Sequence, residues 1–513
     1  MTSSNASRRL FLRQAGALSL LGSSAAPLAL NLAAIGSAAA MSSGDYKALV
    51  CVFLTGGNDA YNTVLATDPA SWRNYTAVRD QAPDSIALQA PGVAPNPGAV
   101  AGSPARLGGV LPISPTNAQG RSFALHPQLG LLQAMFDNDR RLAIVANVGP
   151  LVVPTTKTQY DNIRHPLPAK LFSHNDQMSN WQSFASEGST RGWGGRMADL
   201  LASMNSNATF SAISAGGNAV WLSGQTIRQY QVNTNGAILY GVDTGGSLYG
   251  SHDIGAALQR IARQPTTSHV FEKDYAALTQ RSMDAELVLR NALQPGGRAP
   301  WGTPMQGTYD AKADPKLQYI SPISGRATPS LLARQLQVVA RMIDASGAPG
   351  VGARRQVFFV QIGAFDTHNS QNAVHAEQMA MLAHGLRYFD TTLGQLGARD
   401  KVTTFTASDF GRSFTSNGNG TDHGWGGHHF VMGGAVRGGD IYGRFPVLAA
   451  KNRNDNEFDG SADQLLNGVL LPQVSVDQYG ATLARWFGVS DSQLGDVFPN
   501  LANFGTRNLG FIA

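Results

Sequence analysis

Unbroken runs of apolar residues mark the candidate strands of this 513-residue chain. The first run, at 49–54 within "ALVCVFLTGG", stops at a pair of glycines. Runs of this length are typical of strands buried on both faces, as in a parallel sheet covered by helices. Similar runs predict strands within 140–149, 355–368 and 401–412, and "HHFVMGGAVRGG" predicts a fifth.

A helical pattern lies between the third and fourth of these strands. Leu382, Leu386, Phe389, Leu393 and Leu396 recur at three- and four-residue spacing, which predicts an amphipathic helix. A strand, a helix and a strand in this order form a crossover unit between parallel strands. With a late helix in "SVDQYGATLARWFGV", the pattern predicts an α/β fold.

Two stretches lack this regularity. Residues 91–115 are rich in Pro, Gly and Ala and predict a surface loop. Residues 195–329 show weaker periodicity and many Asn, Ser, Thr and Gly, so we expect an insertion or cap on the core sheet there.

The composition supports a large buried core and gives little reason to expect a nucleic-acid partner. Hydrophobic residues make up 43% of the chain and charged residues 14%, which argues against disorder. The formal net charge is +5, but three arginines near the N-terminus account for most of it, and 36 basic against 34 acidic residues in 41–513 leave +2. No basic cluster that could follow phosphates appears in this part. Cys51 is the only cysteine, so no intramolecular disulfide can form, and its apolar surroundings predict an inert core residue.

The first forty residues have the pattern of an export signal. A basic start with Ser7-Arg8-Arg9-x-Phe11-Leu12 closely matches the twin-arginine signal, and Ala38-Ala39-Ala40 suits signal peptidase. The alternative is a membrane anchor, but Gly22, Pro27 and Asn31 interrupt the apolar segment. We therefore predict cleavage after residue 40, no stable membrane span in the mature chain 41–513, and a periplasmic or secreted protein.

Acidic and imidazole side chains follow three of the predicted strands. Asp59 follows the first, Asp366 and His368 end the third, and Asp409 ends the fourth, before a Gly-rich loop with further Asp and His residues. Loops at the carboxyl ends of the strands in an open α/β sheet converge on ligand sites. Each Asp alone could be a turn residue or helix N-cap. Recurrence at three strand ends favours a divalent metal site, since carboxylates and imidazoles are metal ligands.

These residues also carry a resemblance. The motifs "FLTGGNDAYNTV", "FSHNDQMSNW", "GAFDTH", "SDFGR" and "GTDHGWGGHHFVMGGAVRGG" behind a twin-arginine leader resemble the exported domain-of-unknown-function family numbered fifteen hundred and one. That family is grouped with the alkaline phosphatase and sulfatase superfamily. The resemblance implies a three-layer α/β/α sandwich with an alkaline-phosphatase-like core and a site for two divalent metal ions.

The superfamily pattern is then carried over residue by residue. Asp59 matches the first-strand ligand, and Asp366 with His368 matches the later Asp/His pair. The usual Asp-His dipeptide has two candidates, because Asp409 is followed by Phe410 where a histidine is expected, while Asp422-His423 lies thirteen residues downstream. We favour Asp409 with His423 and keep His428 in reserve. The implied metal ligands are thus Asp59, Asp366, His368, Asp409, Asp422, His423 and His428.

The candidate catalytic residues are Ser173, His174 and Arg412. Ser173 is the best candidate for the superfamily's nucleophile, although it could equally cap the following helix. Arg412 could clamp an anionic substrate or pair with a carboxylate. The sulfatase modification motif, Cys or Ser followed by x-Pro-x-Arg, is absent, which disfavours a formylglycine sulfatase. We expect an exported metal-dependent hydrolase of phosphate or sulfate esters, whose partners are an anionic ester and the twin-arginine machinery. The alternative is a non-catalytic binding or scaffolding protein of the cell envelope that retains the fold.

Overall fold

The computed structural model describes residues 45–513 except 244–245, 264–268 and 453–455. Its centre is a ten-stranded mixed sheet in the order β16-β5-β15-β12-β1-β11-β6-β7-β8, with β17 also paired to β5. The strands in that order are β16 (Ile441–Tyr442), β5 (Leu142–Gly149), β15 (Gly427–Met432), β12 (Val402–Ser408), β1 (Lys47–Leu54), β11 (Arg355–Ile362), β6 (Ala212–Ser214), β7 (Tyr230–Asn233), β8 (Gly236–Ala237) and β17 (Val474–Ser475).

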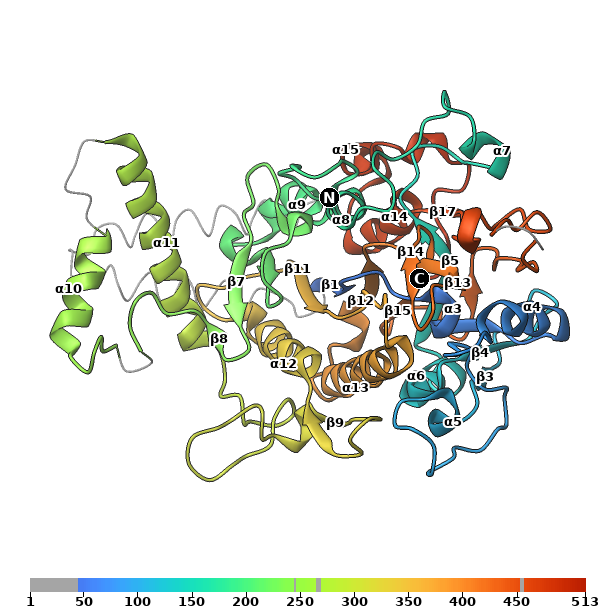
Figure 1. The fold of residues 1–513 in the computed structure, drawn as a ribbon. Coiled ribbons are helices and arrows are strands. Elements are labelled where there is room, and N and C mark those ends of the chain that lie inside the picture. The colour runs from blue at the N-terminus through green and yellow to red at the C-terminus, as the bar shows by residue number, and fades with distance from the viewer. Residues whose placement is uncertain (1–44, 244–245, 264–268, 453–455) are drawn as a thin grey trace, which may run out of the picture.

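Strand β1 shows why the fold has three layers. Ala48, Val50, Val52 and Leu54 belong to one hydrophobic cluster, while Leu49, Cys51 and Phe53 belong to another. Successive side chains of a strand point to opposite faces, so the unbroken apolar run supplies both clusters. Helices cover both faces (Figure 1), with α6 (Gly130–Asp137), α12 (Leu331–Asp344) and α13 (Gln371–Gln395) on one and α8 (His174–Ser183), α9 (Trp193–Leu200) and α14 (Val476–Phe487) on the other. The predicted α/β/α sandwich is confirmed.

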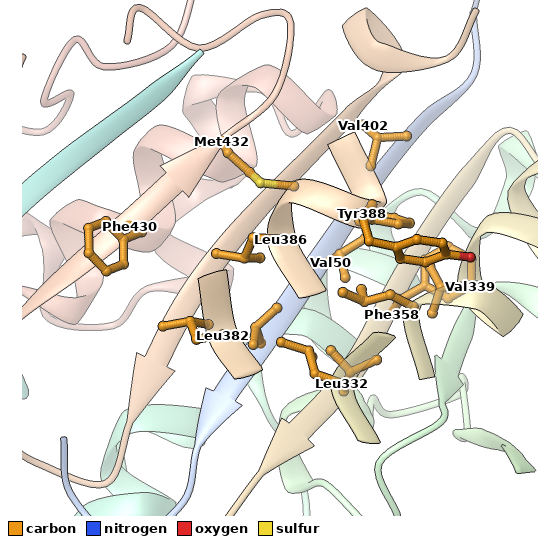
Figure 2. Packing of buried hydrophobic residues seen from close by; sticks show 14 of the residues in the cluster. Val50, Leu332, Val339, Phe358, Leu382, Leu386, Tyr388, Val402, Phe430 and Met432 are labelled. Carbon is orange, nitrogen blue, oxygen red and sulfur yellow. The ribbon is translucent and has the colours of Figure 1, made fainter. Parts of the chain in front are cut away.

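The predicted crossover is present, but the two strands that it connects are not neighbours in the sheet, because a third strand lies between them. Helix α13 connects β11 to β12, and β1 lies between these two strands and pairs in parallel with both. Figure 2 shows Leu382 and Leu386 of α13 packed with Val50 and Phe358 of the sheet. The sheet is not wholly parallel, because β15 runs antiparallel to both β12 and β5.

Residues 195–329 contribute both to the sheet and to a projecting part. Strands β6, β7 and β8 extend the sheet, whereas α10 (His252–Arg263) and α11 (Val270–Ala292) stand beside its end (Figure 1, left). Residues 91–115 are largely loop but include α5 (Pro104–Leu107) and β3 (Leu111–Ile113). Besides short 3-10 helices, the remaining α-helices and strands are α3 (Ala60–Thr63), β2 (Val64–Ala66), α4 (Pro69–Arg79), β4 (Phe123–Leu125), α7 (Lys157–Tyr160), β9 (Gln318–Ile320), β10 (Ala327–Pro329), β13 (Arg412–Ser416), β14 (Thr421–His423) and α15 (Leu494–Val497).

The predicted leader, 1–40, lies outside the described residues, so its export and cleavage stay predictions. Within the described ranges, none of the helices combines the length and apolar character needed to span a bilayer.

Candidate metal centre

The parallel strands β1, β11 and β12 end at one edge of the sheet, and the segments after them build the site. Asp366 lies in the loop after β11, and Asp409 follows β12 directly. The β13–β14 hairpin then folds back and brings His423 to the same place. A close approach within this arrangement requires glycine, because a Cβ on Gly420 would lie 2.3 Å from the backbone of His368.

Three imidazoles converge on the carboxylate of Asp366. His174 Nε2 lies 3.4 Å from Asp366 Oδ2, and His423 Nε2 lies 3.5 Å from Oδ1. His368 Nε2 lies 3.2 Å from the same Oδ1 and 2.9 Å from His423 Nε2. In the part of the chain that the structure describes, one ligand atom each from His174, Asp366 and His423 falls within 4.8 Å of the other two.

The opposite nitrogen of each imidazole has an acceptor. His174 Nδ1 lies 2.8 Å from Asp409 Oδ2, and His368 Nδ1 lies 3.2 Å from Asp422 Oδ1. His423 Nδ1 lies 2.7 Å from the carbonyl oxygen of Phe172, which can only accept, so this Nδ1 carries a proton. Protons on Nδ1 leave the Nε2 lone pairs directed at Asp366. This is the arrangement found around metal-ligating histidines, whose second nitrogen donates to a carboxylate or carbonyl.

The arrangement fits a bound cation. His174 Nε2 is shielded from solvent and has no hydrogen-bond partner among the residues that the structure describes. The Nε2 atoms of His368 and His423, 2.9 Å apart, need a proton or a cation between their lone pairs. Three imidazoles with one carboxylate favour zinc or a related transition metal over magnesium or calcium, which prefer oxygen ligands.

Arg412 pairs with the carboxylate of Asp366. It is fully buried and donates from Nη1 to Asp366 Oδ1 and to the Gly56 carbonyl, both at 2.9 Å. Partial burial would raise the pKa of Asp366, but the hydrogen bond and charge of Arg412 outweigh it and lower the pKa. Of the two roles predicted for Arg412, the structure therefore shows the carboxylate pair, and burial leaves no surface on which it could clamp a substrate.

The imidazoles of His174 and His423 have pKa values shifted in opposite directions. The hydrogen bond to Asp409 raises the pKa of His174, assisted by the negative charges of Asp409 and Asp366. Burial lowers the pKa of His423. His423 is thus neutral at neutral pH, in the state that a metal ligand requires.

Phe410, which replaces an expected histidine, forms an apolar wall behind the imidazoles. Its ring centroid lies 4.7 Å from the centroids of both His174 and His423. Gly57 makes room for this ring, because its φ is +87° and a Cβ there would lie 2.3 Å from the Phe410 ring. Phe410 restricts the rotation of the two rings and supplies no ligand.

Several predicted residues lie outside the cluster. Asp59 pairs with Arg79 at 2.5 Å, deep in the protein. His428 is buried in β15, where its Nδ1 accepts a hydrogen bond from the Asn147 amide at 3.1 Å, so it does not belong to the cluster around Asp366. Burial lowers the pKa of His428 to about 3. Ser173 Oγ donates to Asp176 Oδ2 at 3.0 Å, and its side chain makes no helix-capping hydrogen bond.

The structure also changes the roles of residues within the site. Asp409 and Asp422, predicted as ligands, lie at the Nδ1 atoms of two imidazoles, and Asp409 Oδ1 is buried without a hydrogen-bond partner among the described residues; His174, predicted as catalytic, lies in the group that could hold a metal ion. Two contributors were missed. The Phe172 carbonyl belongs to the backbone and carries no residue-type signal, and Arg79 ends an ordinary helix, α4.

Part of this chain matches a known protein family. Residues 320–497, which include Asp366, His368, Asp409 and His423, match the family model described as "Protein of unknown function (DUF1501)". The resemblance to this family is thereby confirmed over these residues. No match was found among curated proteins.

Solved structures with similarity to the chain include sulfatases and alkaline phosphatases. A protein of glycosaminoglycan metabolism from Bacteroides thetaiotaomicron is 10% identical with a TM-score of 0.33, covering 91% of this chain and 77% of its own. The PsFucS1 sulfatase from Pseudoalteromonas sp. is 9% identical with a TM-score of 0.30, covering 90% and 71%. The alkaline phosphatase of Thermus thermophilus is 12% identical with a TM-score of 0.25, covering 72% and 61%. Similarity of this degree assigns no activity.

Proposed function

We propose that this protein is a metal-dependent hydrolase of phosphate or sulfate esters. The observation that carries the proposal is the convergence of three Nε2 atoms on the Asp366 carboxylate, each imidazole being held from behind at Nδ1. The choice of ester follows from the motif resemblance described in the sequence analysis.

The site is reachable from solvent, which suits catalysis better than a structural role. The side chains of Asp366 and His368 are 45% and 41% exposed. Structural metal sites are closed by protein ligands, whereas catalytic sites keep a position open to substrate or water. The cluster is therefore open to a substrate at these two side chains.

The roles of the residues follow from their contacts. His174, Asp366, His368 and His423 would hold the ion, which supplies Lewis-acid chemistry that polarises an ester oxygen. Asp409, Asp422 and the Phe172 carbonyl keep the protons on Nδ1, so the Nε2 lone pairs stay directed at the ion. Arg412 keeps Asp366 ionised.

The test is a substrate screen of the metal-loaded protein. We expect zinc- or manganese-loaded protein to hydrolyse at least one of p-nitrophenyl phosphate, bis(p-nitrophenyl) phosphate and p-nitrophenyl sulfate. Asp366→Ala and His423→Ala should each lose about 100-fold or more of the rate, since each removes a ligand. His252→Ala, an exposed histidine of α10, is the matched control and should retain the rate. No turnover by the loaded protein would refute the hydrolase and favour the non-catalytic envelope protein.

Export belongs to the same proposal. The twin-arginine pattern of the leader supports delivery to the periplasm or beyond, with the twin-arginine machinery as a transient partner. Replacing Arg8 and Arg9 together by Lys should retain the protein in the cytoplasm, as followed by cell fractionation. Unchanged delivery of this variant would contradict the assignment.

A further inference from the structure

The resemblance implies two metal ions with Asp59 as a ligand, but the structure leaves this carboxylate no room for an ion. Asp59 Oδ1 accepts hydrogen bonds from the Tyr61 amide at 3.1 Å and from Arg79 Nη2 at 3.0 Å. Oδ2 accepts from Arg79 Nη1 at 2.5 Å and from Gln371 Nε2 at 2.6 Å. A carboxylate has about four lone-pair positions, so four donors occupy it fully.

The arginine is as completely engaged as the carboxylate. Besides its two bonds to Asp59, Arg79 donates to Asn62 Oδ1 at 2.8 Å and to the backbone carbonyls of Ser413 and Phe414 at 2.9 and 3.1 Å. All five N–H groups of the guanidinium therefore have an acceptor.

The pair is also shielded from water, and two aromatic rings pack against the guanidinium. The side chains of Arg79 and Asp59 are both 0% exposed. The rings of Tyr61 and Phe414 lie 5.1 and 5.6 Å from the guanidinium carbon, within the range of cation–π contact. An incoming ion would have to displace a buried guanidinium whose N–H groups are all paired.

A hydrogen-bonded chain connects this pair to the metal centre. Gln371 donates to Asp59, and its Oε1 accepts from Thr421 Oγ1 at 2.6 Å. The same hydroxyl oxygen accepts from Arg412 Nε at 3.0 Å, and Arg412 in turn holds Asp366. The Arg79–Asp59 pair therefore belongs to the buried network that holds Asp366 in place. A carboxylate engaged in this network is not available to bind and release a metal ion.

From these contacts we infer that the centre binds one divalent ion and not two, because the guanidinium of Arg79 permanently occupies the carboxylate that the resemblance would give to a second ion. This inference rests on the metal centre of the proposed function and specifies its stoichiometry. The single ion is held by the imidazole-rich cluster. The guanidinium of Arg79 supplies the positive charge that a second ion would have brought to Asp59.

The experiment is a metal count on the intact mature protein. Protein stripped with a chelator is loaded with zinc or manganese, desalted and analysed by elemental mass spectrometry and calorimetric titration. We expect one equivalent in the wild type, one equivalent in Asp59→Asn, and none in His423→Ala, with circular dichroism confirming that each variant is folded. An equal count in the wild type and in Asp59→Asn is the result that argues against a ligand role for Asp59, because that role predicts the loss of one equivalent.

Two bound equivalents in the wild type would overturn the inference, as would loss of one equivalent in folded Asp59→Asn. If Asp59→Asn fails to fold, the count on the wild type decides alone. The outcomes separate this inference from the proposed function. Two ions with ester turnover would leave the hydrolase standing, whereas one ion without turnover would support the stoichiometry and remove the hydrolase.

Discussion

Asp477 offers a test of the structure that does not depend on the metal. It lies in the first turn of α14, is fully buried, and accepts a hydrogen bond from the Asn500 amide at 2.9 Å. Burial raises the pKa of this carboxyl from 3.8 to about 7, although the Asn500 hydrogen bonds and the charge of Arg196 act in the other direction. The folded protein therefore keeps a proton that the unfolded chain loses at much lower pH.

The direction of the effect on stability follows from this difference. Below about pH 4 the carboxyl is protonated in both states and makes no difference to the free energy of unfolding. As the pH rises from about 4 to about 7, the unfolded chain ionises first, so the free energy of unfolding decreases. The difference between 3.8 and about 7 corresponds to about 4 kcal/mol in total, of which roughly 2–3 kcal/mol falls above pH 5.

The substitution Asp477→Asn removes the ionisable group and keeps an acceptor for the Asn500 amide. Relative to the wild type, the variant should gain about 2–3 kcal/mol of unfolding free energy on going from pH 5 to pH 8. Urea denaturation followed by tryptophan fluorescence at both pH values measures this gain. Asp491→Asn is the control, because that carboxylate is 79% exposed and pairs with Arg485 near the end of the same helix. An equal effect of Asp477→Asn at both pH values would refute the buried, protonated carboxyl.

Three further predictions concern the site and its support. Asp409→Asn should weaken metal affinity by about 10–100-fold, since the imidazole that Asp409 orients loses its charged acceptor, and an unchanged affinity in a chelator competition would contradict that role. Arg79→Met should lower the free energy of unfolding by about 3–5 kcal/mol, because it leaves a buried carboxylate unpaired; urea denaturation showing a loss below about 1 kcal/mol would count against the closed pair. Gly57→Ala should destabilise the protein in thermal denaturation more than Gly217→Ala does. The φ angles of the two glycines are nearly equal, +87° and +88°, so the backbone strain is the same. The new Cβ at position 57 would lie 2.3 Å from the Phe410 ring, whereas the nearest atom at position 217 is a side-chain atom 3.9 Å away. Equal effects would show that backbone strain alone matters there.

Much of the fold could be predicted from hydrophobic periodicity, since burial on two faces leaves an unbroken apolar run. The runs at β1, β5, β11 and β12 became strands close to the predicted bounds. Strand direction could not be predicted in the same way. β15 is antiparallel because the short β13–β14 hairpin returns the chain, and a turn of this kind has no apolar signature.

The candidate site was partly predictable because strand ends converge at one edge of a sheet. This rule brought Asp366, His368 and His423 together correctly. It could not predict that Asp59 faces inward, because its partner Arg79 follows twenty residues later on a helix with no distinguishing pattern. Nor could residue type separate Asp409 as a support from Asp409 as a ligand, since both roles use the same carboxylate.

The position of β1 has a consequence for how the chain is made. Among the strands that the structure describes, this strand comes first in the chain, yet its two neighbours, Arg355–Ile362 and Val402–Ser408, follow more than three hundred residues later. A long apolar segment thus leaves the ribosome well before the strands that complete it, and pairing over such sequence distances is slow and exposes the nascent chain to aggregation. The centre of the sheet, with β1 between β11 and β12, cannot form until most of the chain has been made, so newly made chains depend on protection of this segment until then.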